Sequence, residues 1–142
     1  MTVIHTPNKS QLDRNRWIWL GAIAGVASMS AVLVTQAIAI AIWPEIALFK
    51  PLESYLRSAL FTLIPAVAAT AIFAWLAGRK AQPEQSFIKL AVVILVLSII
   101  PDYLLPVEHK TLLASSVTAF LHVIAAVVTV AILVTGYRQQ IS

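Results

Sequence analysis

The sequence predicts an all-α integral membrane protein, a four-helix bundle with its N and C termini in the cytoplasm. Three observations predict this fold: an apolar composition, four long and largely uncharged segments, and an uneven distribution of basic residues. Of the 142 residues, 60% are hydrophobic and 11% are charged, whereas a soluble domain has about 45–50% apolar and about 25% charged residues. The composition therefore favours a chain that is surrounded by lipid.

The lengths of the apolar segments predict the helices. The hydrocarbon core of a bilayer is about 30 Å thick, so a spanning helix needs roughly 20 apolar residues. We expect a polar N-terminal tail over 1–16 and one four-transmembrane-helix domain over 17–142, because the connecting segments are too short to hold another domain. The four predicted spans are 17–43, 56–77, 87–105 and 112–136.

Tryptophans mark both ends of the first predicted helix. Trp17 and Trp19 open it and Trp43 closes it, and indole rings favour the two interfaces of a bilayer. The semi-polar segment 44–51 that follows is expected to lie at the outer interface.

Prolines and one glycine mark the ends of the other helices. Pro51 suits the first turn of the second helix and Pro83 the start of the third, because proline has no N–H and its φ angle is already helical. Pro101 is expected to kink or end the third helix. Gly136 indicates the end of the fourth.

The basic residues predict the orientation of the bundle. Seven of the ten fall in the tail, between the second span and the first turn of the third, or after the fourth, and three fall on the opposite side. By the positive-inside rule, the larger group is cytoplasmic. We expect a multi-pass protein of the inner (plasma) membrane. The cytoplasmic group is Lys9, Arg14, Arg16, Arg79, Lys80, Lys89 and Arg138, and the opposite group is Lys50, Arg57 and Lys110.

Small residues recur every fourth position on the first two helices. Such stripes let helix backbones approach closely in a membrane, and we expect them to pack the first helix on the second, with dimerisation as the alternative. The residues concerned are Gly21 and Gly25, then Ala66, Thr70, Ala74 and Gly78.

His122 is the deepest ionisable residue in the predicted membrane region. It lies roughly 16 Å past Thr111, near the middle of the bilayer, and ionisable groups at such depth are functional candidates. A structural histidine, a proton relay, a quinone-like ligand site and a haem or metal ligand are all compatible with it. Metal is not favoured, because His5 and His109 lie outside the bilayer. Spacing places Ser115, Thr118, His122, Ala125 and Thr129 on one helix face.

Three further polar residues are expected to pair within the bundle. Gln36 lies about 10 Å inside Trp43, so we expect it to pair with His122 or Thr118. Asp102 and Arg57 lie at similar depths near the outer boundary and are expected to form an ion pair. Asp102 and His122 differ by about 10 Å in estimated depth, too far for a direct hydrogen bond.

Together these side chains predict a polar cluster in the outer half of the bundle. It is expected to form a pocket open to the outer face, with Gln36 and His122 at its floor. The candidate ligand-binding residues are His122, Asp102, Gln36, Arg57, Glu45, Tyr103, Thr118 and Ser115.

The sequence also excludes several kinds of chemistry. It contains no cysteine, so it has no disulfide, no thiolate metal site and no covalent haem attachment. It has no Gly-rich phosphate loop, zincin motif or nucleophile elbow. We therefore predict no catalytic residues, metal or cofactor. The net charge of +4 is explained by orientation and predicts no nucleic acid partner.

Residues 58–136 resemble a family of uncharacterised small bacterial four-helix membrane proteins, a domain of unknown function. The matching segments are 74–77, Val92 to Ser98 with the following Ser98-Ile99-Ile100-Pro101, and 120–126 around His122. The family's longer first extracytoplasmic loop is shorter here, and Asp102 has no clear counterpart. The resemblance implies a four-helix membrane fold and no activity.

These observations leave three functions open. The first is a non-enzymatic accessory subunit, or a binder of a partner protein or of a lipophilic small molecule, through the polar cluster. The second is an oligomeric transporter or proton-coupled carrier that uses His122 and Asp102. The third is a membrane enzyme. The expected partners are the lipid bilayer and a membrane protein or further copies of the chain.

Overall fold

The computed structural model describes residues 12–141, and all the regular structure within them is helical. Each of the four long helices is long and apolar enough to span a membrane, as the sequence predicts. They are longer than the predicted spans, because α1 begins before Trp17 and α4 continues past Gly136. The elements are α1 (Arg14–Ile42), the 3₁₀ helices η1 (Pro44–Leu48) and η2 (Lys50–Leu52), α2 (Tyr55–Ala77), α3 (Pro83–Leu104) and α4 (Leu112–Ile141).

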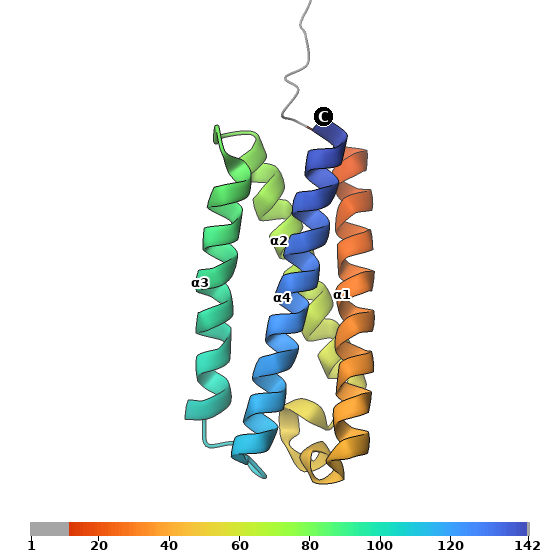
Figure 1. Cartoon of the computed structure of the whole chain (residues 1–142), viewed down its shortest axis with the longest axis vertical. Helices are drawn as coiled ribbons and strands as arrows, with labels where there is room; N and C mark the ends of the chain where they lie inside the picture. Colours follow the sequence, from red (N-terminus) through yellow and green to blue (C-terminus); the bar gives the residue numbers. More distant parts are fainter. Residues whose placement is uncertain (1–11, 142) are drawn as a thin grey trace, which may run out of the picture.

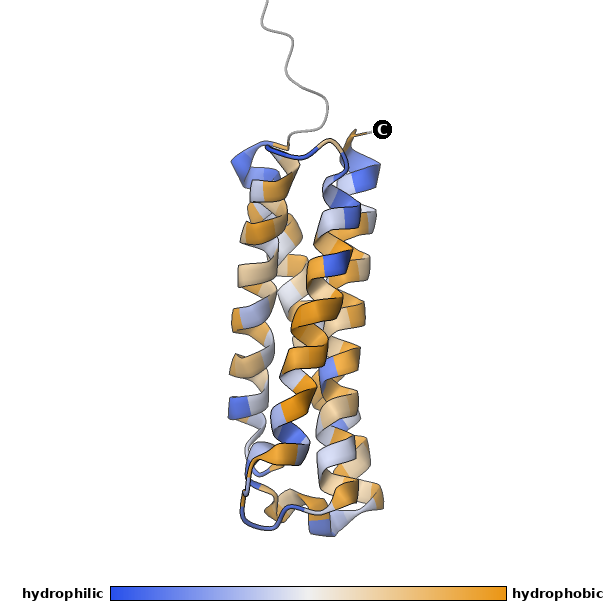
Figure 2. Cartoon of the chain, turned by 90° about the vertical axis from the view of Figure 1, so that its left-hand side faces the viewer, coloured by the Kyte–Doolittle hydropathy of each residue, from blue (hydrophilic) through white to orange (hydrophobic). Residues whose placement is uncertain are grey.

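The two ends of the bundle are different. The start of α1, the end of α4 and the connection 78–82 lie at one end, here called the terminal end (Figure 1). Residues 43–54 and 105–111 form the opposite end, here called the loop end. Figure 2 shows hydrophobic residues along most of the length of the helices and hydrophilic residues concentrated at the two ends.

A local sequence signal explains why α1 begins early. The side chain of Asp13 accepts a hydrogen bond from the backbone N–H of Arg16 at 2.8 Å and caps the helix. Leu12 immediately precedes the cap Asp13, and Trp17 lies four residues after Asp13. Leu12 and Trp17 pack in the same cluster, which is the arrangement of a hydrophobic staple. Residues 14–16 of the predicted tail 1–16 therefore belong to the first turn of α1. The part of the tail over 1–11 lies outside the described residues.

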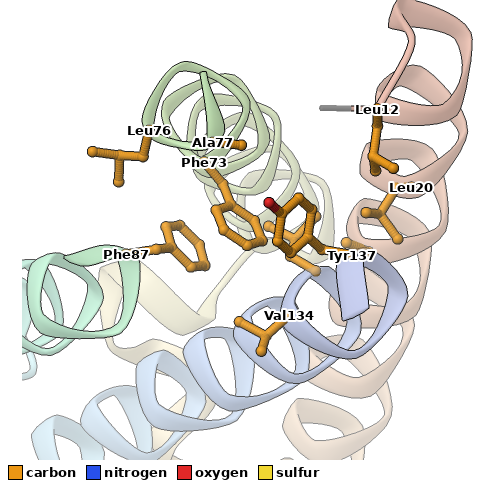
Figure 3. Packing of buried hydrophobic residues seen from close by; sticks show 10 residues of the cluster. Leu12, Leu20, Phe73, Leu76, Ala77, Phe87, Val134 and Tyr137 are labelled. Carbon is orange, nitrogen blue, oxygen red and sulfur yellow. The ribbon is translucent and has the colours of Figure 1, made fainter. Parts of the chain in front are cut away.

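Aromatic side chains form the core of the terminal end (Figure 3). Phe73 of α2 stacks on Phe87 of α3 with ring centroids 4.5 Å apart, and its ring lies 5.1 Å from that of Tyr137 of α4. Trp17 of α1 adds an edge contact to Phe73 at 5.4 Å. All four long helices therefore meet at this end.

The two 3₁₀ helices form much of the core of the loop end. Ile46, Phe49 and Leu52 are each 1% exposed and pack with Val32 and Val117. Their spacing of three residues matches the repeat of a 3₁₀ helix, in which such side chains lie on one face. The segment expected at the outer interface therefore also plugs this end of the bundle.

The predicted small-residue packing joins α1 to α2. A Cβ atom added at Gly21 would lie 2.8 Å from Cγ2 of Thr70, and one added at Gly25 would lie 2.8 Å from Cδ1 of Leu63. Ala66 is also buried in this contact. The stripe ends there, because Ala74 is only half-buried and Gly78 is exposed at the end of α2.

Candidate ligand-binding crevice

A long crevice separates α2 from α3, with α4 at its back. Its volume is about 830 Å³, within the range of about 300–1,000 Å³ that is typical of small-molecule sites. Phe61 and Ile94 line the crevice and are 74% and 47% exposed. The crevice is therefore open along the side of the bundle.

Small side chains and the course of α2 explain why the crevice is not filled. Ala69 on α2 and Ala91 on α3 both line it and are too short to bridge the two helices. In Figure 1, α2 crosses behind α4, from the neighbourhood of α3 at the terminal end towards α1 at the loop end. The close contact of Gly21 with Thr70 holds α2 against α1. At the terminal end, Phe87 lines the crevice and stacks on Phe73.

A carboxylate and an imidazole lie side by side towards the loop end of the crevice. Oδ2 of Asp102 is 2.9 Å from Nδ1 of His122, and the two side chains are 10% and 37% exposed. Both atoms are shielded from solvent, and they approach at ion-pair distance without the angles of a hydrogen bond. Because Nδ1 is the buried nitrogen, the exposed part of the ring lies on the side of Nε2.

This contact overturns the expected separation of about 10 Å in depth. That estimate placed the outer ends of the third and fourth helices at one level, whereas α4 extends further towards the loop end than α3 (Figure 1). Side chains also lean towards the N-terminus of their own helix. Since α3 and α4 are antiparallel, Asp102 and His122 lean towards each other.

Other polar contacts fasten α3 to α4 at the loop end. Ser115 donates to the carbonyl oxygen of Asp102 at 2.6 Å, and the hydroxyl of Tyr103 donates to Ser116 at 3.1 Å. Lys110 donates to the carbonyl oxygens of Tyr103 and Leu105, each at 3.0 Å. The predicted site residues Ser115 and Tyr103 thus hold the helices together.

An ion pair between Glu84 and Arg138 joins the same two helices at the terminal end. The buried residues of α3, Pro83 and Phe87, are also at that end. Helix α3 is therefore attached at both ends, and the crevice runs along its middle.

Arg57 does not form the predicted ion pair with Asp102. Its Nη1 donates to the carbonyl oxygen of Lys50 at 2.7 Å and lies 3.6 Å from Glu53. Glu53 lies just before α2 and Arg57 in its first turn, so this local pair spans the start of the helix. Arg57 and Lys50 still line the loop end of the crevice.

Gln36 does not pair with His122 or Thr118 as expected. It is fully buried, and its Nε2 donates to the carbonyl oxygen of Leu52 at 3.1 Å, while its Oε1 has no hydrogen-bond partner. Gln36 thus holds η2 in place. Glu45 is exposed on η1 and does not line the crevice, so neither residue belongs to the candidate site.

A buried hydroxyl pair at the centre of the bundle was not predicted. The oxygens of Ser28 on α1 and Thr129 on α4 are 2.6 Å apart. Thr129 lies on the helix face that the sequence spacing assigns to it together with His122 and Thr118, and the burial of Thr129 and Thr118 shows that this face points into the bundle. Ser28 lies seven residues after Gly21, a spacing that places it on the same helix face.

Three of the hydroxyls along the crevice donate to their own helices. Thr62, Ser98 and Thr118 each donate to the carbonyl four residues earlier, at 2.8, 2.7 and 3.0 Å. They can therefore only accept hydrogen bonds from a molecule in the crevice. Between residues 12 and 141, His, Asp and Glu side chains form no group of three that could hold a metal ion.

The geometry is that of a mainly apolar crevice with an oriented imidazole near one end. Comparison of the chain with protein families, with curated proteins and with solved structures gave no match.

Proposed function

We propose that this protein is a non-enzymatic multi-pass protein of a bacterial inner membrane that binds a lipophilic small molecule between α2 and α3. The observation that carries the proposal is the crevice of about 830 Å³ with Asp102 and His122 near its loop end. The proposal of a bacterial source rests on the resemblance to small bacterial four-helix membrane proteins. Of the polar residues that the sequence predicts as ligand-binding, the proposal keeps only those that line the crevice.

The surface of the bundle supports insertion into a bilayer. Large apolar side chains are exposed along the helices, among them Phe61, Val92 and Val127, and lipid is the solvent that such a surface requires. The excess of basic residues at the terminal end supports a cytoplasmic location for that end. The loop end, with the polar part of the crevice, then lies near the outer face.

The polar end makes the crevice suitable for an amphipathic molecule. An apolar chain fits between Ala69 and Ala91, while a polar head can reach His122. Lipid tails alone supply no hydrophobic drive towards an apolar crevice, because both environments are equally apolar. Specific binding therefore depends on the head that contacts the polar end.

A proton-coupled carrier is the second candidate function. The observation that favours it is the contact between Asp102 and His122, since such a pair inside a membrane can hold and release a proton. Four helices form a small transport unit, so this function also requires oligomers. Proton flux into liposomes that contain the protein, abolished by Asp102→Asn, would support it, and crosslinking that finds only monomers would oppose it.

A membrane enzyme remains the third candidate. The separation of about 10 Å expected from the sequence would have prevented Asp102 and His122 from acting together as an acid–base pair, and the observed contact at 2.9 Å removes that objection. However, Ser98 and Thr118 donate to their own helix carbonyls, whereas an activated nucleophile is hydrogen-bonded to its base.

Native mass spectrometry of the protein purified in mild detergent tests the proposed function. We expect a bound lipophilic molecule on the unmodified chain and its loss from Ala91→Phe, which fills the crevice. Val92→Phe is the matched control, because Val92 is the next residue on α3, is 55% exposed and does not line the crevice. Equal amounts of ligand on both variants would contradict the proposal, and a co-purified protein subunit in place of a small molecule would favour a partner-binding function.

A further inference from the structure

We infer that the ligand is a neutral lipid with one long chain and a head that bears hydroxyl or carbonyl oxygens. This is the chemistry shared by long-chain isoprenoid alcohols and isoprenoid quinones. The inference rests on the proposed function and specifies the ligand class for the same crevice. It follows from the length of the crevice, the balance of charges at its polar end and the hydrogen-bonding atoms there.

The length of the crevice exceeds that of one lipid leaflet. It runs along α2 from Arg57 to Ile72 and along α3 from Phe87 to Asp102, about 22 Å on either helix at about 1.5 Å per residue. One leaflet contributes about 15 Å, half of a hydrocarbon core of about 30 Å. A chain that fills the crevice from its polar end therefore passes the middle of the bilayer.

The charges at the polar end cancel. Lys50, Arg57 and Asp102 line this end, and Glu53 is paired with Arg57. The two cations and two carboxylates leave no net charge when His122 is neutral. An anionic head such as a phosphate would gain no net attraction and would lie near the carboxylate of Asp102, whereas a neutral head avoids this cost.

The hydrogen-bonding atoms suit a hydroxyl or carbonyl head. The carboxylate of Asp102 beside Nδ1 of His122 favours a proton on that nitrogen, which leaves Nε2 to accept a hydrogen bond from a hydroxyl. Pro65 also lines the crevice, and because proline has no N–H, the carbonyl of Phe61 lacks its usual helical donor on this side of α2. Arg57 adds N–H donors for a carbonyl oxygen.

Lipids that differ in one feature at a time test the inference. The full chain in detergent is titrated with geranylgeraniol, with geranylgeranyl phosphate, with a menaquinone that carries the same tail, and with the shorter alcohol geraniol. Native mass spectrometry then measures the bound fraction of each. We expect geranylgeraniol and the menaquinone to bind at least about tenfold more tightly than geranylgeranyl phosphate or geraniol, a ratio that corresponds to about 1.4 kcal/mol.

Two variants separate binding from folding. His122→Asn keeps an N–H near the position of Nδ1, facing Asp102, and removes Nε2. We expect its free energy of unfolding to fall by less than about 1 kcal/mol, while geranylgeraniol binds about tenfold more weakly, which corresponds to one lost hydrogen bond. Val92→Phe, outside the crevice, should bind as the unmodified protein does.

The possible outcomes are distinguishable. Tighter binding of geranylgeranyl phosphate, or equal binding of all four lipids, would overturn the inference and leave the proposed function standing. Unchanged geranylgeraniol binding by His122→Asn would overturn the role of Nε2. If none of the lipids binds and Ala91→Phe changes nothing, the inference and the proposed function both fail.

Discussion

The Nδ1 atom of His122 lies 2.9 Å from Oδ2 of Asp102, and this contact joins α4 to α3 where α3 buries few side chains. The buried residues of α3, Pro83 and Phe87, are at the other end of the helix. The pair therefore has a structural role, which is to hold the loop end of α3 beside the crevice. Through Nε2 it is also proposed to contact the ligand.

Removing the imidazole should destabilise the protein. In His122→Leu, the carboxylate of Asp102, which is 10% exposed, loses its polar partner, and leaving a buried acceptor without a partner costs about 1–3 kcal/mol. His122→Asn should cost less than about 1 kcal/mol, because one polar contact to the carboxylate is kept. Equilibrium unfolding in mixed detergent measures both, and equal stabilities of His122→Leu and the unmodified protein would contradict the structural role.

The ion pair at the terminal end supplies a control for this prediction. The side chain of Arg138 is 64% exposed where it meets Glu84, and exposed pairs contribute about 0–1 kcal/mol. Glu84→Gln should therefore lower the free energy of unfolding by less than about 1 kcal/mol. If Glu84→Gln lowered the free energy of unfolding as much as His122→Leu does, the difference in exposure between the Glu84–Arg138 pair and the Asp102–His122 pair would not explain their stabilities.

Gly21→Ala should be destabilising although alanine is the better helix former. Alanine in a helix interior gains about 1 kcal/mol over glycine, but the added Cβ would lie 2.8 Å from Cγ2 of Thr70. Thr70 cannot easily rotate away, because its hydroxyl donates to the carbonyl of Ala66 at 2.8 Å. We expect a net loss of about 1–3 kcal/mol.

A second substitution tests the cause of that loss. Thr70→Ala removes Cγ2, so Gly21→Ala introduced into that background should be neutral or stabilising. Unfolding free energies of the two single variants and the double variant give the coupling energy. Additive effects would show that Gly21 and Thr70 do not limit the approach of α1 to α2.

Gln36 should tolerate an apolar side chain of similar length. Gln36→Met removes the hydrogen bond to Leu52 but also removes the unpartnered, buried Oε1, so the two effects oppose each other and the net change should be within about 1 kcal/mol. Gln36→Ala additionally leaves a cavity beside η2 and should cost about 2–3 kcal/mol. Since Gln36 does not line the crevice, ligand binding by Gln36→Met should be unchanged. Loss of ligand binding in this variant would show that Gln36 belongs to the binding site.

The proposed orientation can be tested by labelling single cysteines, because the chain contains none. Glu108→Cys lies at the loop end and Ala81→Cys at the terminal end, both at exposed positions. In intact spheroplasts, a membrane-impermeant maleimide should label Glu108→Cys at once and Ala81→Cys only after lysis. The reverse pattern would contradict the cytoplasmic location of the termini.

The four helices were predictable because their length and hydrophobicity are properties of continuous segments. The packing of the helices against one another was harder to predict, since all four are apolar on every side and the sequence does not show which face is buried. Gly21 and Thr70 were predictable exceptions, because small residues at a spacing of four are uncommon enough to mark a contact. The plug at Ile46, Phe49 and Leu52 was missed, although its spacing of three was present in the sequence.

The candidate site was predicted in part. Asp102, His122, Arg57 and Thr118 do line one crevice, but the partners expected for Asp102 and Gln36 were wrong. Depth counted along each helix cannot reveal that α4 extends further than α3, and this offset brings Asp102 to His122. The crevice itself depends on the relative course of α2 and α3, which no local sequence pattern contains.

The most direct test of the ligand-binding crevice is an experimental structure of the protein in native lipid. The account predicts continuous density for a single chain between Ala69 and Ala91, with its head within hydrogen-bonding distance of Nε2 of His122. A structure in which α3 packs closely on α2, with the crevice closed by side chains and the ring of His122 buried, would contradict it.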